Sequence, residues 1–221
     1  MLIASIFTGA LIISSMGLGR LVLQKVDLDS LPNLDKGLFY VACGFVTINL
    51  ILLFIGLSGQ LNMLSVSIVY ILVAGAALIQ LPVCVSTIKR YFIQFRELNL
   101  RNPWFLLLIP LMILILLNLV GSLAPPSVAD ALRHHLAASQ HYANTGGFEF
   151  IPILPWNVPS FLHITYTTEI LLINDIAPAV THFAFSLLST LAIFALGRRL
   201  IDWKVGLLAA VIFYALPMSI E

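Results

Sequence analysis

The chain has 221 residues, of which 60% are hydrophobic and 10% are charged, and its formal net charge at pH 7 is +1. Soluble domains contain about 45–50% apolar and about 25% charged residues, so this composition excludes an ordinary soluble globular protein. A mean hydropathy of +1.04 also excludes intrinsic disorder, and the near-neutral charge argues against a nucleic-acid partner. We therefore expect an all-α, polytopic membrane protein whose immediate partner is the lipid bilayer.

Six apolar segments are candidate membrane spans, each of which needs about 20 mostly apolar residues. They cover residues 1–23, 38–57, 62–88, 104–122, 177–197 and 205–220. We divide the chain into a three-helix portion (1–88), a basic linker (89–103) and a second portion (104–221). Residues 123–176 of the second portion form a long loop, in which we expect two interfacial helices.

Lysine and arginine are distributed unevenly among the connections between these spans. Ten of the 11 basic residues lie in or beside the first, third and fifth connections, and the remaining one, Arg133, lies in the fourth. Because basic residues concentrate in cytoplasmic loops, the odd connections are expected to be cytoplasmic. The amino terminus and the loop 123–176 are then on the outer side of the membrane.

Small and polar residues inside the apolar segments predict close helix packing. Gly9, Gly17 and Gly19 in the first span allow another helix to approach closely. Arg20, at the end of this span, can extend its charge to the membrane surface. We expect interhelical hydrogen bonds from three amide side chains within spans, Asn49, Gln80 and Asn118.

The long loop and the residues just after it concentrate the polar chemistry of the chain. All five histidines lie there: His134, His135, His141, His163 and His182. So do four of the ten acidic residues: Asp130, Glu149, Glu169 and Asp175. A loop of this length with its own pattern is a candidate functional element.

The first half of the loop predicts a helix that begins at about residue 128 and ends at the Asn144-Thr145-Gly146-Gly147 segment. At 100° per residue, Asp130, His134 and His141 fall within about 40° of one another. One face of this helix therefore carries a carboxylate and two imidazoles.

A proline-containing stretch with Trp156 follows, and then a second helix at about 160–173, which contains His163 and Glu169. Asp175 lies where it can cap the next span.

A carboxylate at the membrane surface can act as a general base toward a hydroxyl or amide acceptor, which makes Asp130 the candidate catalytic residue. Together with His134 and His141 it could hold a divalent metal ion, Mg or Mn, that neutralises a phosphate leaving group. The histidines could instead bind that phosphate directly. The structural alternative is that Ser127 and Asp130 form a capping box, with the histidines packing at the interface.

The loop also carries a recognisable order of residues. Asp130 is followed by Leu132, His135 and Leu136, then by Tyr142 and by Gly146 or Gly147. This order resembles the first outer loop of GT-C-type membrane glycosyltransferases, in particular the bacterial members related to the protein mannosyltransferases. His134 stands where those proteins usually have an aromatic residue. The resemblance covers residues 104–221.

The resemblance implies sugar transfer from a polyprenyl-phosphate donor at the outer face of a bacterial cytoplasmic membrane. Asp130 would be the catalytic base, often with a divalent metal ion nearby. His134, His135, His141 and Tyr142 would bind phosphate or substrate, and Glu221 would stand at a second acidic motif. Because members of the family continue through many more spans, we expect the chain to be the N-terminal portion or a shortened relative.

A second hypothesis comes from another functional class. A six-span protein of this size could be a non-catalytic structural subunit of a larger membrane complex, derived from the same fold. Its partners would then be other membrane subunits, and the long loop, with Trp156 and the prolines, would be a docking surface. Whether the chain is an enzyme is left open at this point.

Overall fold

The computed structural model describes residues 1–28, 30–96, 102–126, 131–153 and 161–216, and the regular secondary structure in these ranges is helical. The elements are α1 (Leu2–Val22), α2 (Asn33–Leu57), α3 (Met63–Arg96), the short 3-10 helix η1 (Pro103–Leu107), α4 (Leu108–Ser122), the π-helix η2 (Ala131–His135), α5 (Leu136–Thr145), α6 (Phe161–Leu172), α7 (Ala177–Leu200) and α8 (Trp203–Tyr214).

Five segments are long and apolar enough to cross a membrane, which supports an integral membrane protein. They are α1, α2, Met63–Gln80 of α3, the η1–α4 segment Pro103–Ser122, and α7. The sixth expected span, 205–220, is not confirmed. In its place lies α8, an apolar helix of 12 residues, whereas a span takes about 20. Residues 217–221 of that segment lie outside the described ranges.

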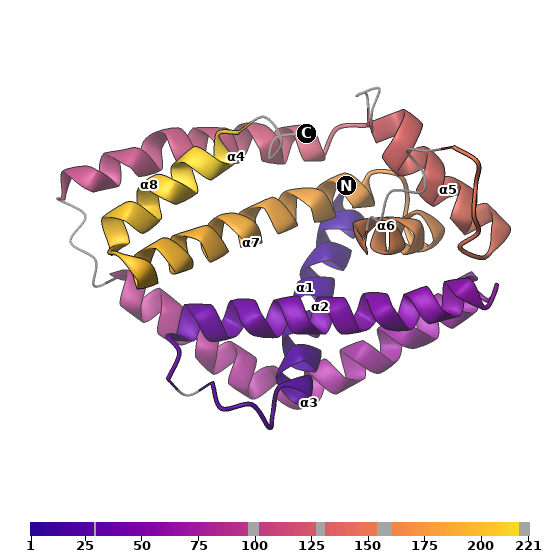
Figure 1. The fold of residues 1–221 in the computed structure, drawn as a ribbon, viewed down its shortest axis with the longest axis horizontal. Helices are drawn as coiled ribbons and strands as arrows, with labels where there is room; N and C mark the ends of the chain where they lie inside the picture. The colour runs from indigo at the N-terminus through magenta and orange to yellow at the C-terminus, as the bar shows by residue number, and fades with distance from the viewer. Residues whose placement is uncertain (29, 97–101, 127–130, 154–160, 217–221) are drawn as a thin grey trace.

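The long helices pack in two groups that are joined by α1 and α7. α1 packs against both α2 and α3, while α7 packs against α4 and α8. Contacts of α7 with α1 and α2 join the groups, so the expected portions 1–88 and 104–221 touch directly (Figure 1). α3 continues to Arg96, so much of the expected linker 89–103 is an extension of this helix.

The largest apolar core lies between α1, α2, α3 and α6. It consists of Leu11, Phe45, Ile48, Leu52, Leu61, Val66, Val69, Val73 and Ile164. Many other large apolar side chains on the spans are exposed, as expected for surfaces that face lipid tails.

The expected glycine packing is found where α1 and α2 meet. A Cβ atom built on Gly19 would lie 1.8 Å from the carbonyl oxygen of Tyr40, and one built on Gly44 would lie 1.8 Å from that of Ser15. The two backbones are therefore in direct contact. A Cβ atom built on Gly17 would lie 2.6 Å from Cα of Ala77 in α3, which is also too close, but Gly9 faces open space, so the prediction is wrong for Gly9.

The three amide side chains form the interhelical hydrogen bonds that their positions predicted. Asn49 Oδ1 accepts from Thr165 of α6 at 2.9 Å. Asn118 donates to the Tyr214 hydroxyl at 3.1 Å, which links α4 to α8. Gln80 Oε1 accepts from Arg20 at 2.6 Å, so the charge of Arg20 is directed toward α3.

Contacts between connections show which of them share an end of the bundle. Asp35, at the start of α2, pairs with Arg198, at the end of α7, at 3.4 Å. At the other end, the Leu61 amide donates to the Gly146 carbonyl at 2.8 Å, and the Phe148 amide donates to the Gly56 carbonyl at 3.0 Å. The first and fifth connections thus lie together, as do the second and fourth, as the distribution of basic residues predicts.

Candidate functional site

The loop helices gather at one end of the molecule, beside the amino-terminal ends of α1 and α7 (Figure 1). α6 packs against α5 and also against α2, α3 and α7. Its residues 163–169 are all buried, which covers nearly two full turns and therefore every side of the helix. The expected interfacial position of this helix is thus not confirmed, because protein surrounds its middle part.

A pair of histidines joins the two loop helices. His135 Nδ1 and His163 Nε2 are 2.6 Å apart, so one ring donates an N–H to the other. Burial, together with the neighbouring His135, lowers the pKa of His163 to about 4. His163 is therefore neutral near pH 7, and its Nε2 can accept the hydrogen bond from His135 in the tautomer that carries the proton on Nδ1.

The aromatic contacts continue from this pair into α7. The rings of His163 and Tyr166 lie 6.0 Å apart, and the Tyr166 hydroxyl forms a 2.9 Å hydrogen bond with Nδ1 of His182. Burial raises the pKa of Tyr166, so its hydroxyl stays protonated. Three of the five histidines thus belong to one row that runs from the exposed His135 of η2 through the buried His163 of α6 to the half-buried His182 of α7.

His141 and the buried Tyr142 belong to a separate part of the loop, away from the histidine row. His141 Nε2 lies 2.9 Å from a carboxylate oxygen of Glu149, and both side chains are largely exposed. Tyr142 packs edge-on against Phe148, beside the turn at Gly146. Gly146 has a φ of 76°, a left-handed conformation that ends α5 where the sequence predicted.

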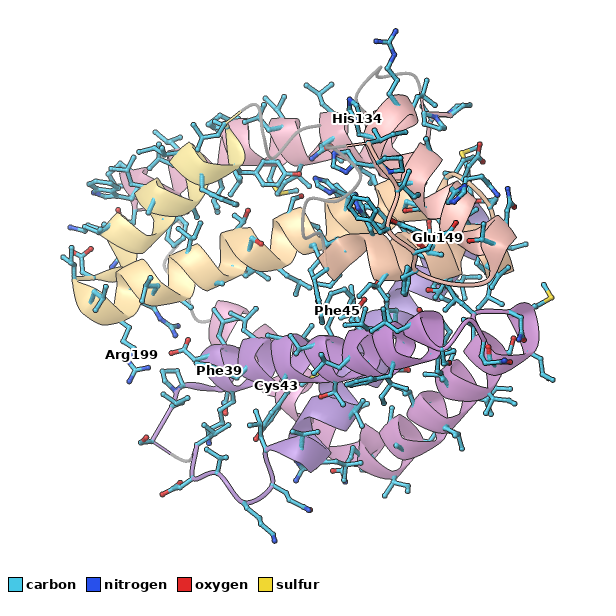
Figure 2. The ribbon with its side chains drawn as sticks, turned by 45° about the vertical axis from the view of Figure 1, so that its right-hand side comes forward. Phe39, Cys43, Phe45, His134, Glu149 and Arg199 are labelled. Atoms are coloured by element: carbon cyan, nitrogen blue, oxygen red, sulfur yellow. The ribbon has the colours of Figure 1, made fainter. Side chains whose placement is uncertain are left out.

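The prediction that Asp130, His134 and His141 share one face assumes a regular α-helix, but Ala131–His135 form a π-helix. Its wider turn changes the angle between successive residues, so the 100° projection does not hold through this segment. His134 lies at the same end of the molecule as Glu149, far from Arg199 (Figure 2).

Asp130 lies outside the described residues, as do Ser127, Trp156 and Glu221. Within the described ranges, no three His, Cys, Asp or Glu side chains form a group that could hold a metal ion. The Mg or Mn site with Asp130, His134 and His141 as ligands therefore stays a prediction.

A buried carboxylate lies one helical turn beyond the histidine row. Glu169 is 0% exposed, and its Oε1 accepts a hydrogen bond from Thr181, which also bonds Thr8 at 2.9 Å. Its Oε2 has no hydrogen-bond partner among the described residues. Burial raises the pKa of Glu169 to about 8, so this side chain is mostly protonated at neutral pH. The helix that carries it, α6, is not one of the candidate membrane spans.

Threonines of α6 extend this polar layer to two further helices. Thr165 donates to Asn49 of α2, and Thr168 forms a 2.7 Å hydrogen bond with the Tyr70 hydroxyl of α3. From the sequence, Glu169 is only one of several loop acids, and this layer is not predicted. The run of threonines around Glu169 was the available signal, because a helix that is polar on several sides needs partners on several sides.

Asn174 rather than Asp175 caps the helix after α6. Its Oδ1 accepts from the backbone amides of Ile176 and Ala177, both at 3.1 Å. The amide side chain of Asn174 takes the position that the carboxylate was expected to fill, one residue earlier in the chain. The charge of Asp175 therefore does not provide the predicted cap.

Comparison with protein-family models, with curated proteins and with solved structures finds no match to this chain.

Proposed function

We propose that this chain is a GT-C-like membrane glycosyltransferase, which uses a sugar linked to polyprenyl phosphate as its donor. The observation that carries the proposal is the His135–His163 pair, because it connects η2, which directly follows the proposed base Asp130 in the sequence, to the buried helix α6. The apolar helices around it are suited to a substrate with a long hydrocarbon tail. The proposed site lies at the end of the bundle that the basic residues predict to be outside.

The proposed role of His135 is to bind the phosphate group of the donor. His163 remains neutral near pH 7 because of its lowered pKa, so it accepts the N–H of His135 and fixes the orientation of that ring. In the proposed complex, both ring nitrogens of His135 donate hydrogen bonds. One N–H bonds His163, and the other donates to an oxygen of the bound phosphate.

The proposed reaction is a single displacement at the anomeric carbon of the sugar. Asp130 removes the proton from an acceptor hydroxyl, and the acceptor oxygen bonds to that carbon. The bond from the carbon to the phosphate oxygen breaks, and polyprenyl phosphate leaves with the electron pair. A divalent metal ion, when bound, would supply charge neutralisation for the phosphate. In this scheme His135 binds the phosphate of the donor, His163 orients His135, and Asp130 removes the proton from the acceptor.

Binding of undecaprenyl phosphate to the full chain in detergent micelles tests the donor site. We expect His135→Gln to weaken binding about tenfold, the usual scale of one charge-assisted hydrogen bond. Gln140→Ala is the matched control, because Gln140 is an exposed polar residue of α5 whose side chain bonds Asn144 on the same helix. Equal affinity of His135→Gln and the wild type would overturn the proposed role.

The catalytic role of Asp130 needs a separate measurement. Asp130→Asn keeps the shape of the side chain but removes the base, so release of polyprenyl phosphate from a labelled donor should fall at least a hundredfold. Undiminished release in a folded Asp130→Asn protein would refute this role. If the wild type binds no donor and purifies in fixed stoichiometry with other membrane subunits, the structural-subunit hypothesis replaces the proposal.

A further inference from the structure

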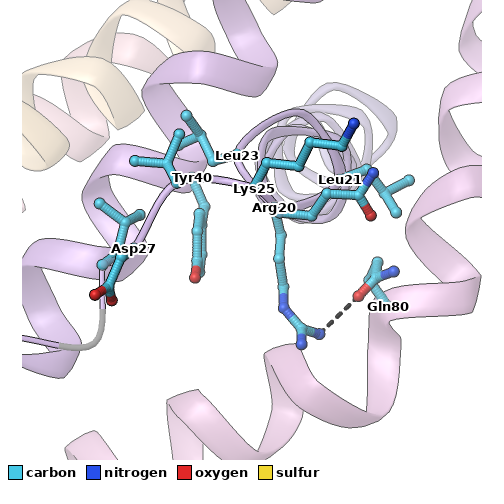
Figure 3. A pocket seen from close by; sticks show the side chains of 10 residues that line it. Arg20, Leu21, Leu23, Lys25, Asp27, Tyr40 and Gln80 are labelled. Atoms are coloured by element: carbon cyan, nitrogen blue, oxygen red, sulfur yellow. Dashed lines mark hydrogen bonds between the residues drawn. The ribbon is translucent and has the colours of Figure 1, made fainter.

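A second polar site lies at the opposite end of α1 from the histidine row. It is a pocket of about 470 Å³ between the end of α1, the connection that follows it, α2 and α3. Its polar lining residues are Arg20, Gln24, Lys25, Asp27, Tyr40 and Gln80. Figure 3 shows Arg20 and Tyr40 extending in the same direction, with Gln80 opposite Arg20.

The guanidinium of Arg20 is held in place inside this pocket. One of its nitrogens donates to Gln80 Oε1 at 2.6 Å, and the side chain is half-buried. A guanidinium has five N–H donors, so this bond leaves others for a ligand. Gln80 is neutral, so it orients the guanidinium without neutralising its charge.

The charges that face the pocket favour an anion. Arg20 and Lys25 are cationic and Asp27 is anionic, so the ionisable lining side chains have a net charge of +1. The Tyr40 hydroxyl and the Gln24 amide add neutral hydrogen-bond donors. Arginine, lysine and neutral donors around one pocket are the groups that proteins use to bind phosphate.

The position of the pocket indicates what carries the anion. Arg20 is one of the last residues of the 21-residue apolar helix α1, and it lies roughly 18 Å along the helix axis from Thr8 in the buried polar layer. An arginine at the end of a membrane-spanning helix lies at the depth of the lipid headgroups. The Asp35–Arg198 pair is at this same end of the bundle.

We propose that this pocket binds a phosphate group, and that its occupant is the headgroup of an anionic phospholipid at the membrane surface. Arg20 and Lys25 bind the phosphate oxygens, and Gln80 orients Arg20. Basic pockets between membrane helices are known to bind such headgroups. The inference is independent of the proposed glycosyltransferase activity, since the two sites lie at opposite ends of α1.

Native mass spectrometry of the full chain with phosphatidylglycerol, compared with phosphatidylcholine, tests the proposal. We expect tight binding of phosphatidylglycerol and a loss of about tenfold in affinity in Arg20→Gln. Arg199→Gln is the matched control, because it removes the same charge from an exposed position at the end of α7. Equal binding of the two lipids, or equal losses in the two variants, would overturn the proposal.

Two further variants keep the test decisive if Arg20→Gln does not fold. Gln80→Glu places a carboxylate against the guanidinium and should reduce phosphatidylglycerol binding while it keeps Arg20 in place. Lys25→Gln should cause a smaller reduction, because Lys25 is exposed. Competition by millimolar inorganic phosphate would support the phosphate site but assign it to a soluble ligand. Unchanged phosphatidylglycerol binding in both Gln80→Glu and Lys25→Gln would refute the proposal of a lipid-headgroup site.

Discussion

Gly44→Ala should separate α1 from α2 and destabilise the membrane domain. The new Cβ atom would lie 1.8 Å from the Ser15 carbonyl oxygen, whereas ordinary van der Waals contact begins at 3.4 Å. Relief of this overlap needs a movement of about 1.6 Å between backbones, since a helix backbone cannot rotate away as a side chain can. Such a movement loosens the core that Leu11 of α1 shares with Phe45 of α2.

Overpacking of this kind typically costs about 1–3 kcal/mol of unfolding free energy. Thermal unfolding in detergent, followed by the loss of the monodisperse peak in size-exclusion chromatography, measures the effect. Gly9→Ala and Gly75→Ala are matched controls, because a Cβ atom at either position meets nothing within 4 Å. Both controls should be neutral or slightly stabilising, since alanine favours helix more than glycine does. Equal melting temperatures of Gly44→Ala and Gly9→Ala would refute the direct backbone contact of α1 and α2 at Gly44.

Three further predictions concern buried polar groups. The pKa of Glu169 is raised from 4.5 to about 8, so between these values the folded protein keeps a proton that the unfolded chain has lost. The melting temperature of the wild type relative to Glu169→Gln should therefore fall as the pH rises from about 5 to about 8, and a difference independent of pH would contradict this. The pKa of His163 is lowered from 6.5 to about 4, so the folded protein should lose stability as the pH falls through this range. The melting temperature of His163→Gln should fall less than that of the wild type over the same range. Equal acid sensitivity of the two proteins would refute this prediction. Tyr214→Phe removes the buried hydroxyl that accepts from the half-buried amide of Asn118 and should cost about 1 kcal/mol, measured by thermal unfolding against the exposed substitution Phe54→Leu as control.

Local features of the membrane helices could be predicted from the sequence. Asn49, Gln80 and Asn118 form the expected interhelical bonds because an amide in an apolar environment must find a partner. The turn at Gly146 was predictable because a left-handed residue at a helix end favours glycine. These features depend on the residue and its near neighbours alone.

The composition of the candidate site was predictable, but its pairing was not. The histidines were recognised as a group, yet the contact between His135 and His163 joins residues 28 positions apart. The projection of one helix also placed His134 and His141 on a common face, and the π-helix at Ala131–His135 invalidates the regular angle on which this rests. Distance along a chain carries no information about which partners meet across two helices.

The sequence by itself determined that this is a helical membrane protein, which of its connections share an end of the bundle, and that its polar chemistry concentrates in one loop. These properties follow from hydropathy, from the distribution of basic residues and from composition. Only the tertiary structure decided that α6 is surrounded by protein, that Glu169 is buried beside Thr181, and that Arg20 lines a pocket with Gln80. Burial and pairing depend on the packing of helices that are distant in the chain, and the local pattern of residues does not specify that packing.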